Sequence, residues 1–429
     1  MEKPINAQRL FLASCIALVV TAMTFAIRAS LLTQLGKDFS LSDTELGWIN
    51  SMAFLGFPIA TIFGGFLYNL LGARRLMWLA FASHMLGLIL TIAAGGFWSL
   101  LISTFFIGFA NGTVEAACNP MIADMFHTNQ TTMLNRFHVW FPGGIVIGAF
   151  CAYLMGNAGI AWQWQIAIMI IPALMYAGLI FGQPFPESKN IETSTAVNFK
   201  NLLSPLYIFV MLCMTLTATT ELGTQQWVER ILGKAGAHPM LVLMLVTGLM
   251  AVGRFFAGPV IHRLNPSGVL WASSFIAALG IFLMSIATGP LVYLAAVVFA
   301  VGVMYFWPTM IGFTAENIPK TGALGMSLMG GAGMFATSIW QPIIGGWLDK
   351  NKVAALTEMA EISQAEAQEA VKMGSGFAES NPDVWNAAEL AAGQATLGNI
   401  VIFPLILIVA FGGLFFYMRS QKTSKAVHA

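Results

Sequence analysis

The sequence predicts an all-α membrane protein with twelve transmembrane helices in two pseudo-symmetric six-helix bundles. Of its 429 residues, 57% are hydrophobic and only 9% are charged, whereas about a quarter of the residues of a soluble domain carry charge. The apolar runs are long and unbroken, which excludes an outer-membrane barrel built from short alternating strands. With 20 Lys and Arg against 19 Asp and Glu, no net charge attracts nucleic acid. The four cysteines lie inside apolar runs without a Cys-x-x-Cys motif, so neither a disulfide framework nor a metal site is indicated.

Twelve stretches reach the roughly 20 apolar residues that a transmembrane helix needs. They cover residues 10–35, 46–70, 76–94, 98–125, 137–156, 163–183, 205–232, 239–261, 268–287, 290–313, 325–347 and 396–418. The first stretch runs on past Arg28 without a convincing small-residue cleavage site, so we expect a span there and not a signal peptide. Residues 1–183 form the predicted N-terminal bundle, 184–204 a proline-containing cytoplasmic linker, and 205–429 the C-terminal bundle.

The distribution of charge predicts the orientation of the spans. If the N-terminus is inside, the cytoplasmic segments hold 12 Lys and Arg and 4 Asp and Glu. The outer segments then hold 6 Lys and Arg and 12 Asp and Glu. This twofold excess of basic residues places both termini in the cytoplasm. We expect a multi-pass protein of the plasma membrane, the inner membrane of a bacterium.

Residues 349–394 carry 8 acidic and 3 basic residues, which places this insert outside the cell. Within it, residues 351–373 read as one polar helix rich in Ala, Glu and Gln. The sequence leaves open whether the insert is a solvated hood or an element that binds a partner or gates the protein.

An internal repeat links the two halves. The second span ends in Gly-Phe-Leu-Tyr-Asn-Leu-Leu-Gly-Ala-Arg-Arg from Gly65, and the eighth ends in a similar glycine-spaced helix followed by basic residues. Aligning Gly65 with Gly258 gives an offset of 193 residues. The first motif resembles the loop 2–3 signature of the major facilitator superfamily, with Asn69 where that family usually has Asp. The resemblance implies two bundles that rock around a midplane site, with Asn69, Arg74 and Arg254 at gating positions.

Charged residues within spans mark a cavity or a partner, because charge is costly at membrane depth. Arg28 cannot lose its charge, and its planar fork suits a carboxylate, phosphate or sulfonate. The offset maps Arg28 onto Glu221, which allows either a structural ion pair or a substrate site. Gln225 shares a helix face with Glu221, and Gln226 and Trp227 adjoin it. Amide and aromatic groups suit a hydroxylated ring, although Trp227 equally suits the interfacial belt.

The fourth span carries Asn111, Glu115 and Asn119 at four-residue spacing. A carboxylate at this depth is what a proton-coupled carrier needs, because it binds and releases a proton as its surroundings alternate; a Glu neutralised by a helix neighbour is the structural alternative. Asp124 and Arg136 suggest a structural or gating pair near the cytoplasmic end of the span.

The stretch from Glu115 to Asn119-Pro120 resembles the fourth span of the fucose–proton symporter branch, which implies that Glu115 couples protons and that Asn119 lies at the site. Arg28 is similar to the span 1 Arg of the anion–cation symporter branch, which implies that it binds an acidic group. His138 is a weaker candidate for the inner cavity, and Trp307 in span 10 suggests an aromatic gate or substrate contact.

These residues predict a secondary transporter and not an enzyme. Neither a nucleophile–base constellation nor a phosphate-binding Gly-Lys-Ser/Thr loop occurs. We expect symport of a sugar acid or similar organic anion, driven by a proton or sodium gradient without other cofactors, by a monomer in the lipid bilayer. A neutral-sugar symporter is the alternative, with Arg28 then held by Glu221. A drug or metabolite exporter is a less favoured alternative.

Overall fold

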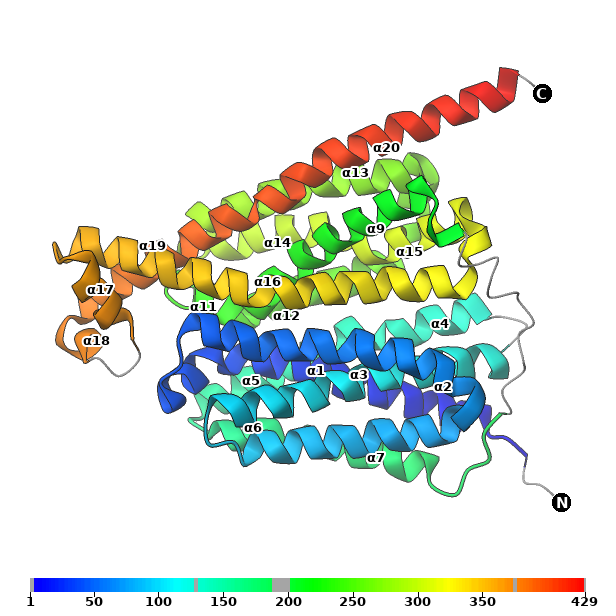
Figure 1. Cartoon of the computed structure of the whole chain (residues 1–429), viewed down its shortest axis with the longest axis horizontal. Coiled ribbons are helices and arrows are strands. Elements are labelled where there is room, and N and C mark those ends of the chain that lie inside the picture. Colours follow the sequence, from blue (N-terminus) through cyan, green and yellow to red (C-terminus); the bar gives the residue numbers. More distant parts are fainter. Residues whose placement is uncertain (1–3, 127–129, 187–200, 373–375, 428–429) are drawn as a thin grey trace.

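The computed structural model describes residues 4–126, 130–186, 201–372 and 376–427, and this part of the chain is almost entirely helical (Figure 1). The helices are α1 (Ala7–Phe39), α2 (Asp43–Ile92), α3 (Phe97–Met125), α4 (Gln130–His138), α5 (Trp140–Asn157), α6 (Trp162–Ala167), α7 (Ile170–Ile180), α9 (Pro205–Ala218), α10 (Thr224–Gln226), α11 (Val228–Leu232), α12 (Pro239–Phe255), α13 (Ala257–Ile286), α14 (Leu291–Val303), α15 (Phe306–Asn317), α16 (Gly322–Met359), α17 (Gln364–Val371), α18 (Phe377–Ser380), α19 (Pro382–Ile400) and α20 (Ile402–Val427), with the π-helix η1 (Thr219–Gly223) and the 3-10 helix η2 (Pro319–Thr321).

The helices account for the predicted spans. Among the described residues, ten helical segments are long and apolar enough to cross a membrane, and α12 is a shorter apolar helix. The predicted eleventh span, 325–347, lies within α16. The predicted all-α membrane fold is therefore confirmed.

The backbone repeats at the offset found in the sequence. Gly72 in α2 has φ 72° and ψ 163°, and Asn265, 193 residues later in α13, has φ 58° and ψ 160°. Positive φ is open to glycine and is tolerated by asparagine better than by most other residues. Each residue marks a sharp turn between two successive spans, so the two halves share this local conformation.

The helices lie in two groups along a common direction. Helices α1 to α7 form one group and α9 to α20 the other (Figure 1). Both termini lie at one end of the molecule, here called the terminal end, and α17 and α18 lie at the opposite end, called the insert end. Most of the predicted linker, 184–204, falls outside the described residues.

The two groups meet most closely along α2 and α16, which run antiparallel. A Cβ added to Gly47 would lie 2.6 Å from the carbonyl oxygen of Gln341, and one added to Gly345 would lie 2.2 Å from that of Asp43. Toward the terminal end the helices separate, because a Cβ at Gly331 would meet only the Pro58 side chain, at 3.9 Å. The insert end is thus sealed by direct backbone contact.

The insert folds as a small cap on the second group. Buried Leu356, Ala367 and Ala388 from α16, α17 and α19 form its core. The predicted continuous helix over 351–373 is wrong, because α16 ends at Met359 and Glu361 has a φ of 52°. A Ser363–Glu366 capping box then starts α17, and its hydrogen bonds lower the pKa of Glu366.

Candidate functional site

Arg28 lies between the two helix groups, where α1 faces the start of the C-terminal half. Its side chain is buried, and Nη2 donates to Oε1 of Gln226 at 2.5 Å. Gln226 in turn donates to the backbone oxygen of Phe25 at 3.3 Å. The guanidinium carbon lies 5.2 Å from the ring centroid of Phe25 and 5.7 Å from that of Phe54. Because Nε and Nη1 are buried without an acceptor, this guanidinium can still bind an anion.

Glu221 and Gln225 share a helix face as predicted, but that face packs on α12. Glu221 Oε1 accepts from Arg254 Nη2 at 3.2 Å, and Gln225 Nε2 lies 3.4 Å from the sulfur of Met250. The Arg28–Glu221 ion pair that the offset allowed is therefore not formed. The offset of 193 residues relates equivalent backbone positions in the two halves, and it does not predict that the side chains at these positions point toward each other. Arg254, expected at a gate, instead joins Glu221 to the carbonyl of Met304.

A π-helical turn, η1, contains Glu221 and precedes Gln225 and Gln226. In η1 each turn contains more residues than an α-helical turn. The regular α-helical spacing is therefore interrupted just before Gln225 and Gln226, although Glu221 and Gln225 still both contact α12. Gln226, next to the predicted Gln225, is the amide that reaches Arg28. Such turns are frequent at functional sites.

The two candidate tryptophans lie inside the protein. Trp227 is fully buried, which excludes the lipid interface for it, and its Nε1 is without an acceptor. Trp307 is partly buried against a set of apolar residues from both groups of helices, the central aromatic cluster: Phe25, Phe54, Phe57, Leu222 and Met334, with Phe141 and Trp307 at its border. The cluster adjoins Arg28, because two of its members, Phe25 and Phe54, are the rings that lie next to the guanidinium group.

Glu115, Asn119 and His138 come together on α3 and α4. Asn119 Nδ2 donates to Glu115 Oε2 at 2.7 Å, as the four-residue spacing predicts. The amide oxygen of Asn119 lies 3.2 Å from His138 Nε2, and His138 Nδ1 lies 3.9 Å from Glu115 Oε1. The His138 side chain is 46% exposed and that of Glu115 14%. A carboxylate and an imidazole thus lie together in a partly exposed position.

The expected gating pair near the terminal end is not formed. Asp124 accepts a hydrogen bond from the Tyr68 hydroxyl at 3.0 Å. Arg136 is exposed and makes no ion pair with Asp124 in the described part of the chain. Arg74 is also exposed. The side chain of Asn69 lies outside the described residues, so its gating role stays a prediction.

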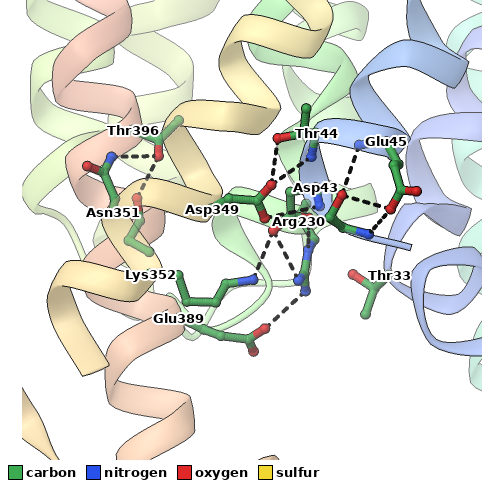
Figure 2. Close-up of polar contacts among 12 residues, drawn as sticks. Thr33, Asp43, Thr44, Glu45, Arg230, Asp349, Asn351, Lys352, Glu389 and Thr396 are labelled. Atoms are coloured by element: carbon green, nitrogen blue, oxygen red, sulfur yellow. Dashed lines mark hydrogen bonds and ion pairs between the residues drawn. The ribbon is translucent and has the colours of Figure 1, made fainter. Parts of the chain in front are cut away.

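A network of charges closes the insert end, and the sequence did not predict it (Figure 2). Asp43 at the start of α2 accepts from Arg230 Nε at 2.6 Å and from Lys352 Nζ at 2.9 Å. Arg230 also pairs with Glu389 at 3.0 Å. Asp43 belongs to the first group of helices and the other three residues to the second. We call these four residues the insert-end ion network.

Two further contacts join the groups at the same end. Asp349 of α16 accepts from the backbone N–H groups of Asp43 and Thr44, at 3.1 and 2.9 Å, and so caps α2 from the other group (Figure 2). Glu229 accepts from the Thr33 backbone at 3.3 Å. In the sequence, these charged residues are distinguished only by lying at the ends of spans. Ordinary solvent-exposed residues also occupy such positions, so the sequence does not predict the contacts.

Within the described part of the chain, no group of three or more His, Cys, Asp or Glu side chains could hold a metal ion. Arg28 and Gln226 are buried polar residues that lie where the two groups of helices meet, and charges close one end of this contact.

Comparison with known proteins agrees with this arrangement. The chain is 28% identical over 204 residues to the cis,cis-muconate transport protein of Acinetobacter baylyi, covering 44% of this chain and 48% of that protein. It is 28% identical over 157 residues to the hexuronate transporter of Bacillus subtilis, covering 36% of each. The aligned region thus spans half or less of the length of these relatives.

Solved structures share the fold over nearly the whole chain. A bacterial homologue of the human lysosomal transporter Spinster, inward-facing and unoccupied, has a TM-score of 0.77 at 14% identity, covering 98% of each chain. A D-xylose-proton symporter has a TM-score of 0.68 at 14% identity, covering 91% of this chain and 97% of that one. The sequence model of the Major Facilitator Superfamily matches residues 13–341. This match agrees with the two helix groups, the turn that repeats in each of them and the polar site between them. The chain therefore belongs to the major facilitator superfamily, a family of transporters and not of enzymes.

Proposed function

We propose that the protein is a secondary active transporter that moves a small hydroxylated organic anion, such as a sugar acid, by alternating access in symport with a proton. It acts as a monomer in the plasma membrane, the bacterial inner membrane, with both termini in the cytoplasm and the insert end outside. Arg28 carries the proposal. It is a permanent cation at the contact of the two halves, and two of its nitrogens are without an acceptor. A carboxylate supplies the missing acceptors and charge.

Glu115 supports the coupling to protons. It lies on α3 beside Asn119 and His138, in a partly exposed setting that a proton can reach. The resemblance of this stretch to the fucose–proton symporter branch supports the same role. A sodium ion is the other coupling ion that carboxylate oxygens can serve.

The relatives support the substrate class. The names of two of them specify acids, cis,cis-muconate and hexuronate. Hexuronates combine a carboxylate with hydroxyl groups, which suits Arg28 together with the neighbouring amide of Gln226.

A neutral sugar is the second candidate. The hydrogen bond from Arg28 to Gln226 supports it, because an amide already satisfies one nitrogen of the cation. The chain is also 26% identical over 155 residues to a D-xylose transporter of Levilactobacillus brevis.

Thermal stabilisation of the purified full chain separates the candidates. A ligand that binds the folded state raises its melting temperature by mass action. Glucose against glucuronate, and galactose against galacturonate, should be compared at low and high pH. We expect stabilisation by the acids. Stabilisation by the neutral sugars alone would support the second candidate, and no stabilisation by any of the four would contradict both.

A further inference from the structure

Two buried amide side chains at the contact of α2 and α16 have no hydrogen-bond partner. Asn50 and Gln341 are both 0% exposed, and in each the amide oxygen and nitrogen are without a partner. Buried polar side chains are normally satisfied. Asn111, which is equally buried, shows the normal case, because it donates to Thr24 and pairs with His84. No contact within the described part of the protein satisfies the polar atoms of these two amides.

The register of α2 and α16 places both amides beside the central aromatic cluster. Gly47 of α2 lies against Gln341 of α16, and Asn50 lies one turn further along the same face of α2. Phe54 follows Asn50 by four residues on this face, and Met334 precedes Gln341 by seven on α16. Because Phe54 and Met334 both belong to the cluster, the two amides lie on its insert-end side.

Arg28 lies at nearly the same depth as Asn50. The rings of Phe25 and Phe54 are in contact, with centroids 5.3 Å apart. Arg28 is three residues beyond Phe25 toward the insert end, and Asn50 is four residues from Phe54 in the same direction. At 1.5 Å per residue these steps are about 4.5 and 6 Å. The unpartnered nitrogens of Arg28 and the unpartnered amide of Asn50 therefore lie at similar depth, and Gln341, beside Gly47, lies about one helical turn further toward the insert end.

We propose that Arg28, Asn50 and Gln341 form one binding site for a polyhydroxylated carboxylate, in which the two amides read the hydroxyl groups. The proposal rests on the proposed function and adds the residues that select the substrate. An amide side chain can donate hydrogen bonds through its nitrogen and accept them through its oxygen, and a hydroxyl group can likewise both donate and accept. A second carboxylate would satisfy the amide nitrogens but leave both amide oxygens unpaired. The site therefore favours an aldonate or uronate over a dicarboxylate or an unsubstituted carboxylate.

The ligand also bridges the halves. Asn50 comes from the N-terminal half and Gln341 from the C-terminal half, and the insert end is closed above them by the insert-end ion network. A bound hydroxylated anion satisfies polar atoms that closure otherwise leaves unpaired. Binding should therefore favour the closed arrangement.

The test uses the purified full chain and two probes that share a ring and a carboxylate, glucuronate with hydroxyl groups and cyclohexanecarboxylate without them. The variants are Asn50→Leu and Gln341→Met, which keep approximately the shape and remove the amide. We expect each variant to bind glucuronate at least about tenfold more weakly, because one unpaired polar contact has this effect. Affinity for cyclohexanecarboxylate should stay the same.

The melting temperature without ligand is the second readout. Because the unpaired amides do not stabilise the empty protein, both variants should melt at or above the wild-type temperature. The matched control Asn111→Leu breaks two hydrogen bonds and should melt lower. If Asn50→Leu or Gln341→Met melts as low as this control, or fails to fold, the amides are structural and the inference is wrong.

The outcomes separate the inference from the proposed function. Wild-type affinity for glucuronate in both variants would overturn the inference and leave the function standing. A wild-type protein that binds neither probe would overturn the function and the inference with it. Asn50→Asp gives a further check, since its charge should repel a carboxylate on Arg28 and lower glucuronate affinity at least about tenfold. Unchanged affinity would place Asn50 away from the anion and contradict the shared site.

Discussion

Replacing Arg230 with Gln should open the insert end of the protein. The side chain of Arg230 is only 5% exposed and that of Asp43 is 0% exposed. Arg230 holds both oxygens of Asp43, at 2.6 and 3.3 Å, and one oxygen of Glu389 at 3.0 Å. In Arg230→Gln the buried carboxylate of Asp43 and the partly buried carboxylate of Glu389 lose a cation, and Asp43 regains solvent when the halves separate at this end.

The contacts give the size of the effect. Breaking a buried ion pair by removing one partner costs about 3–5 kcal/mol. Lys352 still neutralises part of the Asp43 charge, at 2.9 Å, so the lower value applies. About 3 kcal/mol changes the ratio of closed to open protein by roughly 100-fold. A ratio of about 100 to 1 in the wild type would then become close to 1 to 1.

Distances between spin labels can measure this ratio. Lys37, two residues before the end of α1, and Glu358, one residue before the end of α16, are exposed and belong to opposite halves. Labels at these positions, with the four native cysteines replaced, report the separation of the halves. We expect a second, longer distance in Arg230→Gln that is weak or absent in the wild type.

An exposed ion pair at the same end provides the control. Lys372 and Glu369 pair within the insert and are 68% and 69% exposed. Surface pairs contribute little, so Lys372→Gln should keep the wild-type distance. If Arg230→Gln also keeps it, the insert-end ion network does not hold this end closed, and the reasoning fails.

Three other predictions follow from the site and the seam between the halves. Glu115→Gln cannot release a proton, so it should lose gradient-driven accumulation of substrate but keep counterflow exchange; equal loss of both would make Glu115 a binding or structural residue. Arg28→Lys loses the planar fork and should weaken the affinity for acidic ligands at least about tenfold, and an unchanged binding isotherm would contradict the anion site. Gly345→Ala places a Cβ 2.2 Å from the Asp43 carbonyl oxygen and should destabilise the closed end by about 1–3 kcal/mol. Gly346→Ala is its control, because the added Cβ meets only the Thr44 hydroxyl, at 3.5 Å; the label distances should distinguish the two variants.

The fold could be predicted from the sequence because a bilayer leaves few alternatives. A long apolar run must become a helix, since every backbone polar group in lipid needs a partner within the chain. The repeat was also visible, and Gly72 and Asn265 show it in the backbone. The break of the helix after Met359 was missed because a polar, alanine-rich run satisfies helix propensity on both sides of it.

The contacts within the site were predictable only where both partners lie on one helix. The bond from Asn119 to Glu115 follows from a spacing of four residues. The partners of Arg28 and Asp43 come from residues 198 and 187 positions away. No periodicity connects such distant residues.

The length of α16 has a mechanical consequence. Its 38 residues extend about 57 Å, nearly twice the roughly 30 Å of a bilayer's hydrocarbon core. A helix of this length acts as a lever, and tilting it as a unit by about 10° around the midplane swings its far tip by roughly 5–10 Å. Because α17 packs on this tip through the core of the insert, the insert travels with it. If the C-terminal half rocks as proposed, this length would amplify a small rotation into a displacement outside the bilayer, which a fluorophore or a bound antibody fragment on the insert would follow.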